Sequence, residues 1–259
     1  RGRLEEVAED LFPDDAPLSD PPMVDLTDFD PEAEVKLVCS ALYPVSNRSD
    51  REIERRVRLM TVDERLAVLS AFEGDRGNRR HRPGRALERP SYRFDVLSDY
   101  GAFRDLQRHR MLTLDWQRLS AAHGFVRPPE VDDAGLSDRF DAAMERSRGL
   151  HDALEPAFPD QAPYAVSLAY RVRYMMHMNA REAMHVIELR TTPQGHASYR
   201  EVCQQMHNLI ADEAGHHAIA AMMSFVDHSS APELERLESE RRSKQKRTKR
   251  LNRPDSHTA

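Results

Sequence analysis

The chain of 259 residues is 39% hydrophobic and 32% charged, contains 10 glycines and carries a formal net charge of -6. This composition is typical of a soluble, helix-rich protein with one or two domains. No apolar run reaches the roughly 20 residues of a membrane-spanning helix, and no signal-peptide pattern is visible. Cys39 and Cys203 are too far apart in the sequence to indicate a disulfide framework or a zinc site. We therefore expect a cytoplasmic protein, and the first residue, Arg1, suggests a segment of a longer polypeptide.

The two ends of the chain differ in charge. Residues 5–34 are acidic and contain several prolines, whereas residues 241–250 read RRSKQKRTKR and contain no acidic residue. Segments with strong charge and few apolar residues do not form a packed core. We therefore predict an acidic arm or linker over 1–32, one folded domain over 33–228 and a disordered basic tail over 229–259. The tail lacks interleaved aromatic residues, so it does not indicate nucleic-acid binding.

The first part of the predicted domain favours helices followed by a strand. Residues 31–43 have helical apolar spacing, and Thr61 with Glu64 forms a capping box at the start of a helix over 62–72. After a loop rich in Gly and Arg, residues 91–100 alternate between apolar and polar side chains. This alternation predicts a strand.

Helices are predicted to dominate the second part of the domain. One helix follows Ser137, and two longer helices are expected over 163–190 and 198–226. The last of these begins with a capping box formed by Ser198 and Glu201.

A single strand is not stable alone, so the sequence must contain further strands. The best candidates lie near residues 112–114 and around Val45. The pattern therefore predicts an α+β fold in which helices dominate.

A set of arginines lies within otherwise apolar segments, close to the only tryptophan. A buried guanidinium without a partner is costly, so this density implies anionic partners. Phosphates match the guanidinium fork well. The alternative is salt bridges within the protein, to Asp105, Asp115, Glu182 and Glu188, and both interpretations remain open. The arginines are Arg104, Arg108, Arg110, Arg171, Arg173, Arg181 and Arg190.

Two pairs have the spacing of metal ligands on a helix, His185 with Glu188 and Glu213 with His216. A di-iron carboxylate site requires two Glu-x-x-His motifs and two further glutamates, and only Glu213 and His216 have the right order. We therefore predict no metal site. The chain also lacks the glycine-rich phosphate-binding, zinc-protease and nucleophilic-serine motifs.

Several segments together resemble the flavin-dependent thymidylate synthases. FRDLQRHR at 103–110, followed by a stretch that ends in Ser120, resembles the family signature, in which Arg-His-Arg precedes seven residues and a serine. MNAREAMHVIELR at 178–190 and HASYREV at 196–202 resemble the second conserved block of the family. HRPGRALE at 81–88 is loosely similar to a third segment. The segments follow the family's order over most of the predicted domain.

The resemblance implies long helices packed on a central antiparallel sheet, and a homotetramer with each active site at a subunit junction. It implies FAD as the cofactor, NADPH and methylenetetrahydrofolate as co-substrates, and reductive methylation of dUMP to dTMP as the reaction. By matched position, Arg190 and Ser120 are expected to be catalytic, and Arg104, Arg118 and Arg190 to bind the nucleotide. The residues expected to bind FAD are Arg108, His109, Arg110, Asn179, Arg181 and His185.

The chain departs from the family pattern on the nucleotide side. Arg118 stands where the family has its serine, and Ser120 lies two places later. Trp116 replaces a glutamate, Asp105 replaces a glutamine, and Pro163 lies where a phosphate-binding arginine is expected. Three interpretations remain open. The protein is an active thymidylate synthase in which Arg118 binds phosphate, a non-catalytic or altered-substrate FAD- and nucleotide-binding module of a longer duplicated protein, or a helical assembly protein.

Overall fold

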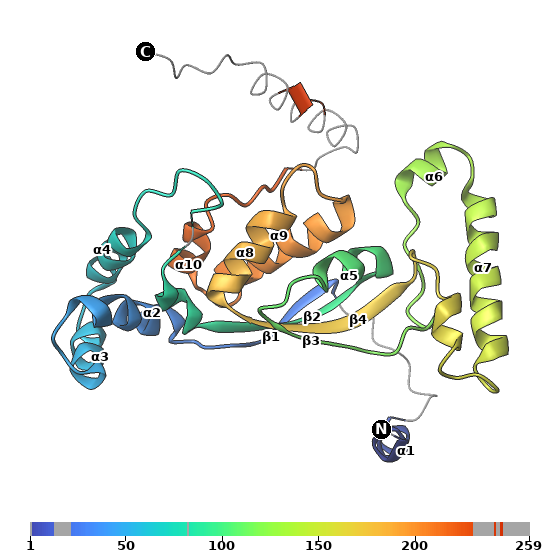
Figure 1. The fold of residues 1–259 in the computed structure, drawn as a ribbon, viewed down its shortest axis with the longest axis horizontal. Helices are drawn as coiled ribbons and strands as arrows, with labels where there is room; N and C mark the ends of the chain where they lie inside the picture. The colour runs from blue at the N-terminus through green and yellow to red at the C-terminus, as the bar shows by residue number, and fades with distance from the viewer. Residues whose placement is uncertain (1, 13–21, 82, 230–240, 242–243, 246–259) are drawn as a thin grey trace, which may run out of the picture.

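A four-stranded antiparallel sheet forms the centre of the fold (Figure 1). The computed structural model describes residues 2–12, 22–81, 83–229, 241 and 244–245. The strands lie in the order β1-β2-β4-β3, and β2 and β4 pair along their whole length, so segments far apart in the sequence form the centre of the sheet. Their bounds are β1 Val24–Phe29, β2 Ser91–Asp99, β3 Thr113–Trp116 and β4 Arg171–Asn179.

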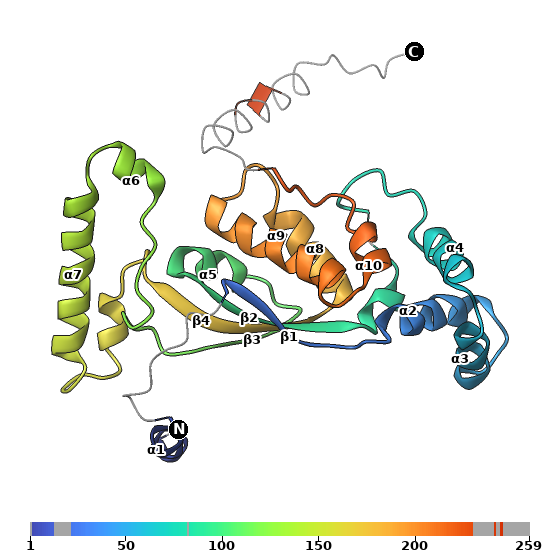
Figure 2. The ribbon, with the colours of Figure 1, turned by 180° about the vertical axis from the view of Figure 1, so that it is seen from behind.

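Helices cover one face of the sheet and group at its two ends (Figures 1 and 2). The covering helices are α5 (Tyr100–Leu106), α8 (Ala180–Arg190), α9 (Ala197–Asp212) and α10 (His217–Met222). At one end lie α2 (Ala33–Leu42), η1 (Tyr43–Val45), α3 (Asp50–Arg58), α4 (Val62–Glu73) and η2 (Arg85–Glu88). At the other lie α6 (Pro129–Asp133), η3 (Ala162–Ala165) and α7 (Ser137–Leu154), the helix predicted after Ser137. α1 (Gly2–Leu11) precedes the sheet, and none of the described helices is long and apolar enough to span a membrane.

The main core lies between the sheet and the covering helices. Alternate residues of β2 and β4 are buried there, and α8 and α9 contribute their apolar sides. Removal of this apolar surface from water holds the helices on the sheet. A second, smaller core packs beneath α7, and it consists of Ala121, Met144, Val166 and Tyr170. The largest buried side chains of the main core include Tyr92, Phe94, Tyr174, Met176, Met184, Ile187 and Met206.

The predicted helix over 163–190 is wrong in its first half, because residues 171–179 form β4. Buried and more exposed side chains alternate along this segment, which is the period of a strand. Pairing with β2 overrides the helical preference of its methionines. The helix begins only after Asn179, whose Oδ1 accepts a hydrogen bond from the backbone nitrogen of Glu182 at 2.9 Å.

The predicted helix over 198–226 is two helices, α9 and α10. Gly215 separates them with a φ of 68°, a conformation that glycine adopts without steric cost. The capping box predicted at Ser198 is also wrong, because the N-cap residue of α9 is His196. The Ser198 hydroxyl instead donates a hydrogen bond to the Asp99 carboxylate and so ties α9 to the end of β2.

The remaining local predictions each concern one helix or strand. In the capping box of α4, the backbone nitrogen of Glu64 donates to Thr61 Oγ1 at 3.2 Å, and the backbone nitrogen of Thr61 donates to Glu64 Oε2 at 2.8 Å. The strand predicted over 91–100 is confirmed as β2, and the one near 112–114 as β3. The strand predicted around Val45 is wrong, because this residue lies in the 3-10 helix η1.

The acidic arm predicted over 1–32 includes part of the sheet. Val24 and Leu26 of β1 are only 3% and 4% exposed, and β1 pairs with β2. The exposed Asp25 lies between these two buried positions, and the acidic composition of the segment concealed this strand from sequence analysis. The basic tail predicted over 229–259 lies almost wholly outside the described residues.

Candidate functional site

The two main family-like segments meet at the end of α8. Arg190, its last residue, donates a hydrogen bond from Nε to Nε2 of His109 at 3.0 Å, across 81 positions of sequence. Its Nη2 donates to the backbone oxygen of Asp105 at 2.5 Å. The guanidinium also lies 5.3 Å from the centroid of the Tyr199 ring, in a cation–π contact. These contacts fix both the position and the orientation of the Arg190 side chain.

His109 is enclosed between Arg190 and two further residues of α8. Its side chain is 6% exposed, and its Nδ1 lies 3.5 Å from Glu182 Oε1. Because Nε2 accepts from Arg190, a neutral His109 carries its hydrogen on Nδ1, facing this carboxylate. The rings of His109 and His185 meet edge to face at 5.6 Å. We call His109, Glu182, His185 and Arg190 the α8 cluster.

Desolvation lowers the pKa of His185 against the opposing charge of Glu182, and the neighbouring His109 and Arg79 lower it further. His185 is therefore biased toward its neutral form. A neutral imidazole both donates and accepts, so it can contact a polar ring without adding charge to the site.

The first turn of α8 joins the cluster to a neighbouring pocket. Arg181 donates from Nε to the backbone oxygen of Pro83 at 3.2 Å and from Nη1 to Glu88 Oε1 at 3.0 Å. Glu88 lines a pocket of about 760 Å³ between α2, α4 and η2, which we call the α2–α4 pocket. Asn179 uses Oδ1 for the helix cap, so its amide nitrogen is the group that can donate to a ligand.

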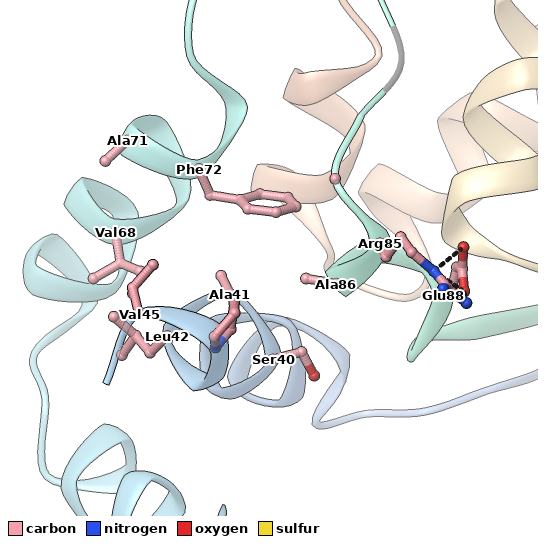
Figure 3. Close-up of a pocket in the computed structure, with 12 residues that line it drawn as sticks. Ser40, Ala41, Leu42, Val45, Val68, Ala71, Phe72, Arg85, Ala86 and Glu88 are labelled. Atoms are coloured by element: carbon pink, nitrogen blue, oxygen red, sulfur yellow. Dashed lines mark hydrogen bonds and ion pairs between the residues drawn. The ribbon is translucent and has the colours of Figure 1, made fainter. Parts of the chain in front are cut away.

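The α2–α4 pocket is mainly apolar with a polar end (Figure 3). Phe72 projects from α4 across the space between α4 and η2, whereas Ser40, Arg85 and Glu88 gather toward one side. A Cβ on Gly84 would lie 2.4 Å from the Phe72 ring, so glycine at this position lets the ring occupy its place. The remaining lining residues are Ala41, Leu42, Pro44, Val45, Val68, Ala71 and Ala86.

Three arginines of the first segment are exposed near the α8 cluster. Arg104 and Arg110 are exposed, and the Arg108 side chain is 71% exposed. Arg108 Nη1 lies 3.5 Å from Asp105 Oδ1, a surface ion pair of small energetic value. The structure therefore leaves their guanidiniums accessible to an anionic ligand.

Arg118 and Ser120, two of the residues predicted on the nucleotide side, lie in the segment that follows β3. Arg118 Nη1 contacts Glu155 Oε1 at 3.1 Å, and Ser120 Oγ accepts from the backbone nitrogen of Ala122 at 3.3 Å. Trp116 is 54% exposed, so it is no core anchor, although its ring lies 5.7 Å from that of Phe103. Among the described residues, no hydrogen bond or ion pair joins Arg118 or Ser120 to the α8 cluster.

The salt-bridge interpretation of the arginines holds for some of them. Arg173 pairs with Asp95 across the sheet, at 2.7 Å between Nη2 and Oδ2. Glu188 was predicted as a possible partner of one of the seven arginines named from the sequence, but it pairs with Arg76, which is not among them. This contact also removes Glu188 from any metal site, and the described residues contain no group of three or more His, Cys, Asp or Glu placed to hold a metal ion.

Sequence reasoning missed Glu182, Glu88 and Arg76 as components of this region. Glu182 follows the Asn179 cap within the first turn of α8, which places it on the side facing His109. Glu88 stands in the segment HRPGRALE, already singled out by its resemblance. Arg76 carries no local signal, because its partner lies 112 positions away.

Comparisons with known proteins identify the family. The model of the family "Thymidylate synthase complementing protein" matches residues 29–216. A UPF0159 protein of Chlamydia pneumoniae is 38% identical over 185 residues, which cover 71% of this chain and 35% of the relative. UPF0159 proteins of Chlamydia muridarum and Thermoplasma acidophilum are 34% and 35% identical, covering 83% and 79% of this chain but 40% and 41% of the relatives. The chain thus spans about two fifths of the length of the curated relatives it matches.

Solved structures show the same fold at low sequence identity. The UMP/dUMP methylase PolB of Streptomyces cacaoi, bound with 5-Br dUMP, has a TM-score of 0.60 and 18% identity over 76% of this chain and 94% of its own. The flavin-dependent thymidylate synthase ThyX of Helicobacter pylori, complexed with FAD and dUMP, has a TM-score of 0.54 and 17% identity over 79% and 99%. These findings overturn the interpretation as an unrelated helical assembly protein. The chain belongs to the thymidylate synthase complementing protein family, and its fold is that of the flavin-dependent thymidylate synthases.

Proposed function

We propose that this chain forms the FAD- and nucleotide-binding site of a thymidylate synthase-like enzyme, which converts dUMP to dTMP by reductive methylation in the cytoplasm. The hydrogen bond between Arg190 and His109 carries the proposal, because it joins the two family motifs in one enclosed cluster. Family membership supports the same conclusion.

The residues around the α8 cluster fit FAD. A flavin ring is planar with large apolar surface, which suits the lining of the α2–α4 pocket. The pyrophosphate of FAD requires cations, and the exposed Arg108 and Arg110 and the half-buried Arg181 supply them. The residues proposed to hold FAD are therefore Arg108, His109, Arg110, Asn179, Arg181 and His185.

Arg190 is proposed to hold and polarise the pyrimidine. FAD, when bound and reduced by NADPH, supplies the hydride, and methylenetetrahydrofolate supplies the carbon. The Arg190 guanidinium stabilises negative charge that develops on a pyrimidine carbonyl, because His109 and Asp105 already fix its orientation. No protein nucleophile is required, and burial raises the pKa of the Cys203 thiol to about 12, which makes it a poor one.

The nucleotide phosphate is proposed to bind Arg118, with Arg104 and Ser120 completing this side. Arg118 is partly exposed, and its ion pair among the described residues is with Glu155, a partner that a phosphate can replace. Because no hydrogen bond or ion pair joins Arg118 or Ser120 to Arg190 among the described residues, the site is proposed to form between copies in a homotetramer, or with another part of a longer chain.

A second candidate is an altered nucleotide substrate. The family serine and glutamate positions hold Arg118 and Trp116, and a structurally similar protein is a UMP/dUMP methylase. An exposed indole can stack on a base, and an additional guanidinium changes phosphate contacts. UMP is therefore the first alternative substrate to compare with dUMP.

The test begins with the absorbance spectrum of the purified protein and its titration with FAD, dUMP and UMP. We expect flavin bands that shift on addition of one nucleotide, followed by release of the label from that nucleotide deuterated at C5. Flavin bands without turnover would instead support a non-catalytic module. A colourless protein that cannot be reconstituted with FAD would contradict the proposed function. Light scattering of the same sample measures the assembly.

A further inference from the structure

A buried ion pair lies outside the proposed ligand contacts, between Arg76 and Glu188. The side chains are 5% and 1% exposed, and Arg76 donates from Nη1 and Nη2 to the two carboxylate oxygens at 2.8 and 2.7 Å. Arg76 belongs to the loop between α4 and η2, and Glu188 to α8. We call the described part of this loop, residues 74–81 and 83–84, the clamp loop.

Further contacts complete the environment of the pair. Arg76 Nη1 also donates to the backbone oxygen of Met222 at 2.7 Å, at the end of α10, and the guanidinium lies 5.2 Å from the Phe225 ring centroid. Glu188 Oε1 also accepts from the backbone nitrogen of Phe225 at 3.4 Å. A buried pair adds little net stability relative to apolar side chains, but breaking it leaves an uncompensated charge. Its geometry therefore favours one particular position of the loop.

The other end of the clamp loop is also attached to α8, through the hydrogen bond from Arg181 Nε to the Pro83 oxygen. Within the loop, the backbone nitrogen of Gly77 donates to His81 Nδ1 at 3.1 Å. Arg79 and Arg80 lie between these attachments, and the charge of Arg79 acts on His185 of the α8 cluster. Figure 1 shows the loop rising from α4 and descending beside α10 to η2.

Glu188 connects the clamp loop to the helix that carries the α8 cluster. It lies three residues after His185 and two before Arg190, but its side chain points away from the ligand contacts to Arg76. We infer that Arg76 and Glu188 are positioning residues: their ion pair holds the clamp loop on α8 and thereby places Arg79 close to His185 of the proposed flavin site. This inference rests on the proposed function for its ligand, but not for the attachment itself.

The attachment is tested without ligand by limited proteolysis with trypsin, which cleaves after Arg79 and Arg80. The variants are Glu188→Gln, which keeps the shape and removes the charge, and Arg76→Met, which leaves the Glu188 carboxylate buried without its counter-charge. We expect cleavage within the loop, identified by mass spectrometry, to become at least about tenfold faster in both variants. The control is Arg127→Met, which breaks an ion pair with Asp141 far from the loop.

The second measurement is the dissociation constant for FAD, from flavin fluorescence at a temperature where circular dichroism shows each variant folded. We expect a rise of about tenfold in both variants, corresponding to the loss of one charge-assisted contact, and no change in Arg127→Met. Faster cleavage with unchanged FAD affinity would overturn the positioning role. Unchanged cleavage would overturn the clamp itself. If the wild-type protein binds no FAD, the proposed function fails, whereas the cleavage rates still decide whether the clamp exists.

Discussion

The α8 cluster and the segment that begins with Trp116 carry the two sides of the proposed site, but they differ in burial and in their contacts. His109 and Arg190 are mostly buried, and each contacts at least two other protein groups. Trp116 is largely exposed and Arg118 is partly exposed, and the ion-pair partner of Arg118, Glu155, directly follows α7, which packs on its own small core. The residues of the α8 cluster are therefore already fixed without ligand, whereas those proposed for the nucleotide phosphate remain accessible to another surface.

The largest effect is expected for Arg190, whose contacts with His109 and Asp105 are present without ligand. Arg190→Ala removes the guanidinium proposed to polarise the pyrimidine, so turnover should fall by about 10² to 10³. FAD affinity should change less than turnover, because Arg190 is assigned to the nucleotide. Label release from deuterated dUMP, together with an FAD titration, measures both quantities. Arg139→Ala, an exposed change on α7, is the control. Turnover within about twofold of wild type would remove Arg190 from the chemistry.

A smaller effect is expected for Arg108→Ala, which tests whether the exposed arginines bind the same cofactor as the α8 cluster. The side chain is exposed and its ion pair with Asp105 is weak, so Arg108→Ala should leave the free energy of unfolding within about 0.5 kcal/mol of wild type. Loss of a charged hydrogen bond to the cofactor should weaken FAD binding by about 10- to 100-fold. Fluorescence titration and urea unfolding measure the two quantities. Unchanged flavin affinity would reassign Arg108 to the protein surface.

Substitution of Arg118 is the corresponding test on the proposed nucleotide side. If its guanidinium binds the nucleotide phosphate, Arg118→Ala should raise KM for dUMP about tenfold with little change in kcat. Glu155→Gln releases Arg118 from its partner and should not raise KM. Steady-state kinetics of both variants separate these effects. An equal rise in KM for both would mean that the pair with Glu155, rather than phosphate binding, matters for this segment.

The local signals of the sequence predict an element correctly where neighbouring residues decide its conformation, and fail where long-range contacts decide it. The capping box at Thr61 and the alternation over β2 were sufficient because each depends on neighbouring residues. The segment of β4 was assigned to a helix because its methionines and arginines favour helices. Its pairing with β2 on one side and β3 on the other, both long-range contacts, makes it a strand.

The same limit applies to the candidate site. The residues that match family motifs, including His109 and Arg190, could be selected from the sequence because the motifs fix their identity. Their partners Glu182 and Glu88 could not, because a glutamate on a helix is ordinarily a solvent-exposed residue. The orientation of Arg118 toward Glu155 depends on where α7 packs, which no local pattern of residues specifies.

The smallest effect concerns His216, buried beneath the covered face of the sheet. Burial lowers the pKa of this ring, although Glu34 and Asp30 act in the opposite direction. As the pH falls below about 6.5, the unfolded chain therefore binds a proton before the folded one, and the free energy of unfolding decreases by at most about 1.4 kcal/mol per pH unit. His216→Gln should reduce this slope between about pH 6.5 and 5 in urea unfolding, whereas the exposed neighbour His217→Gln should not. An identical slope in His216→Gln would mean that the protons taken up on unfolding bind to groups other than His216. The buried face of the sheet would then contribute no more to the pH dependence of stability than the exposed groups.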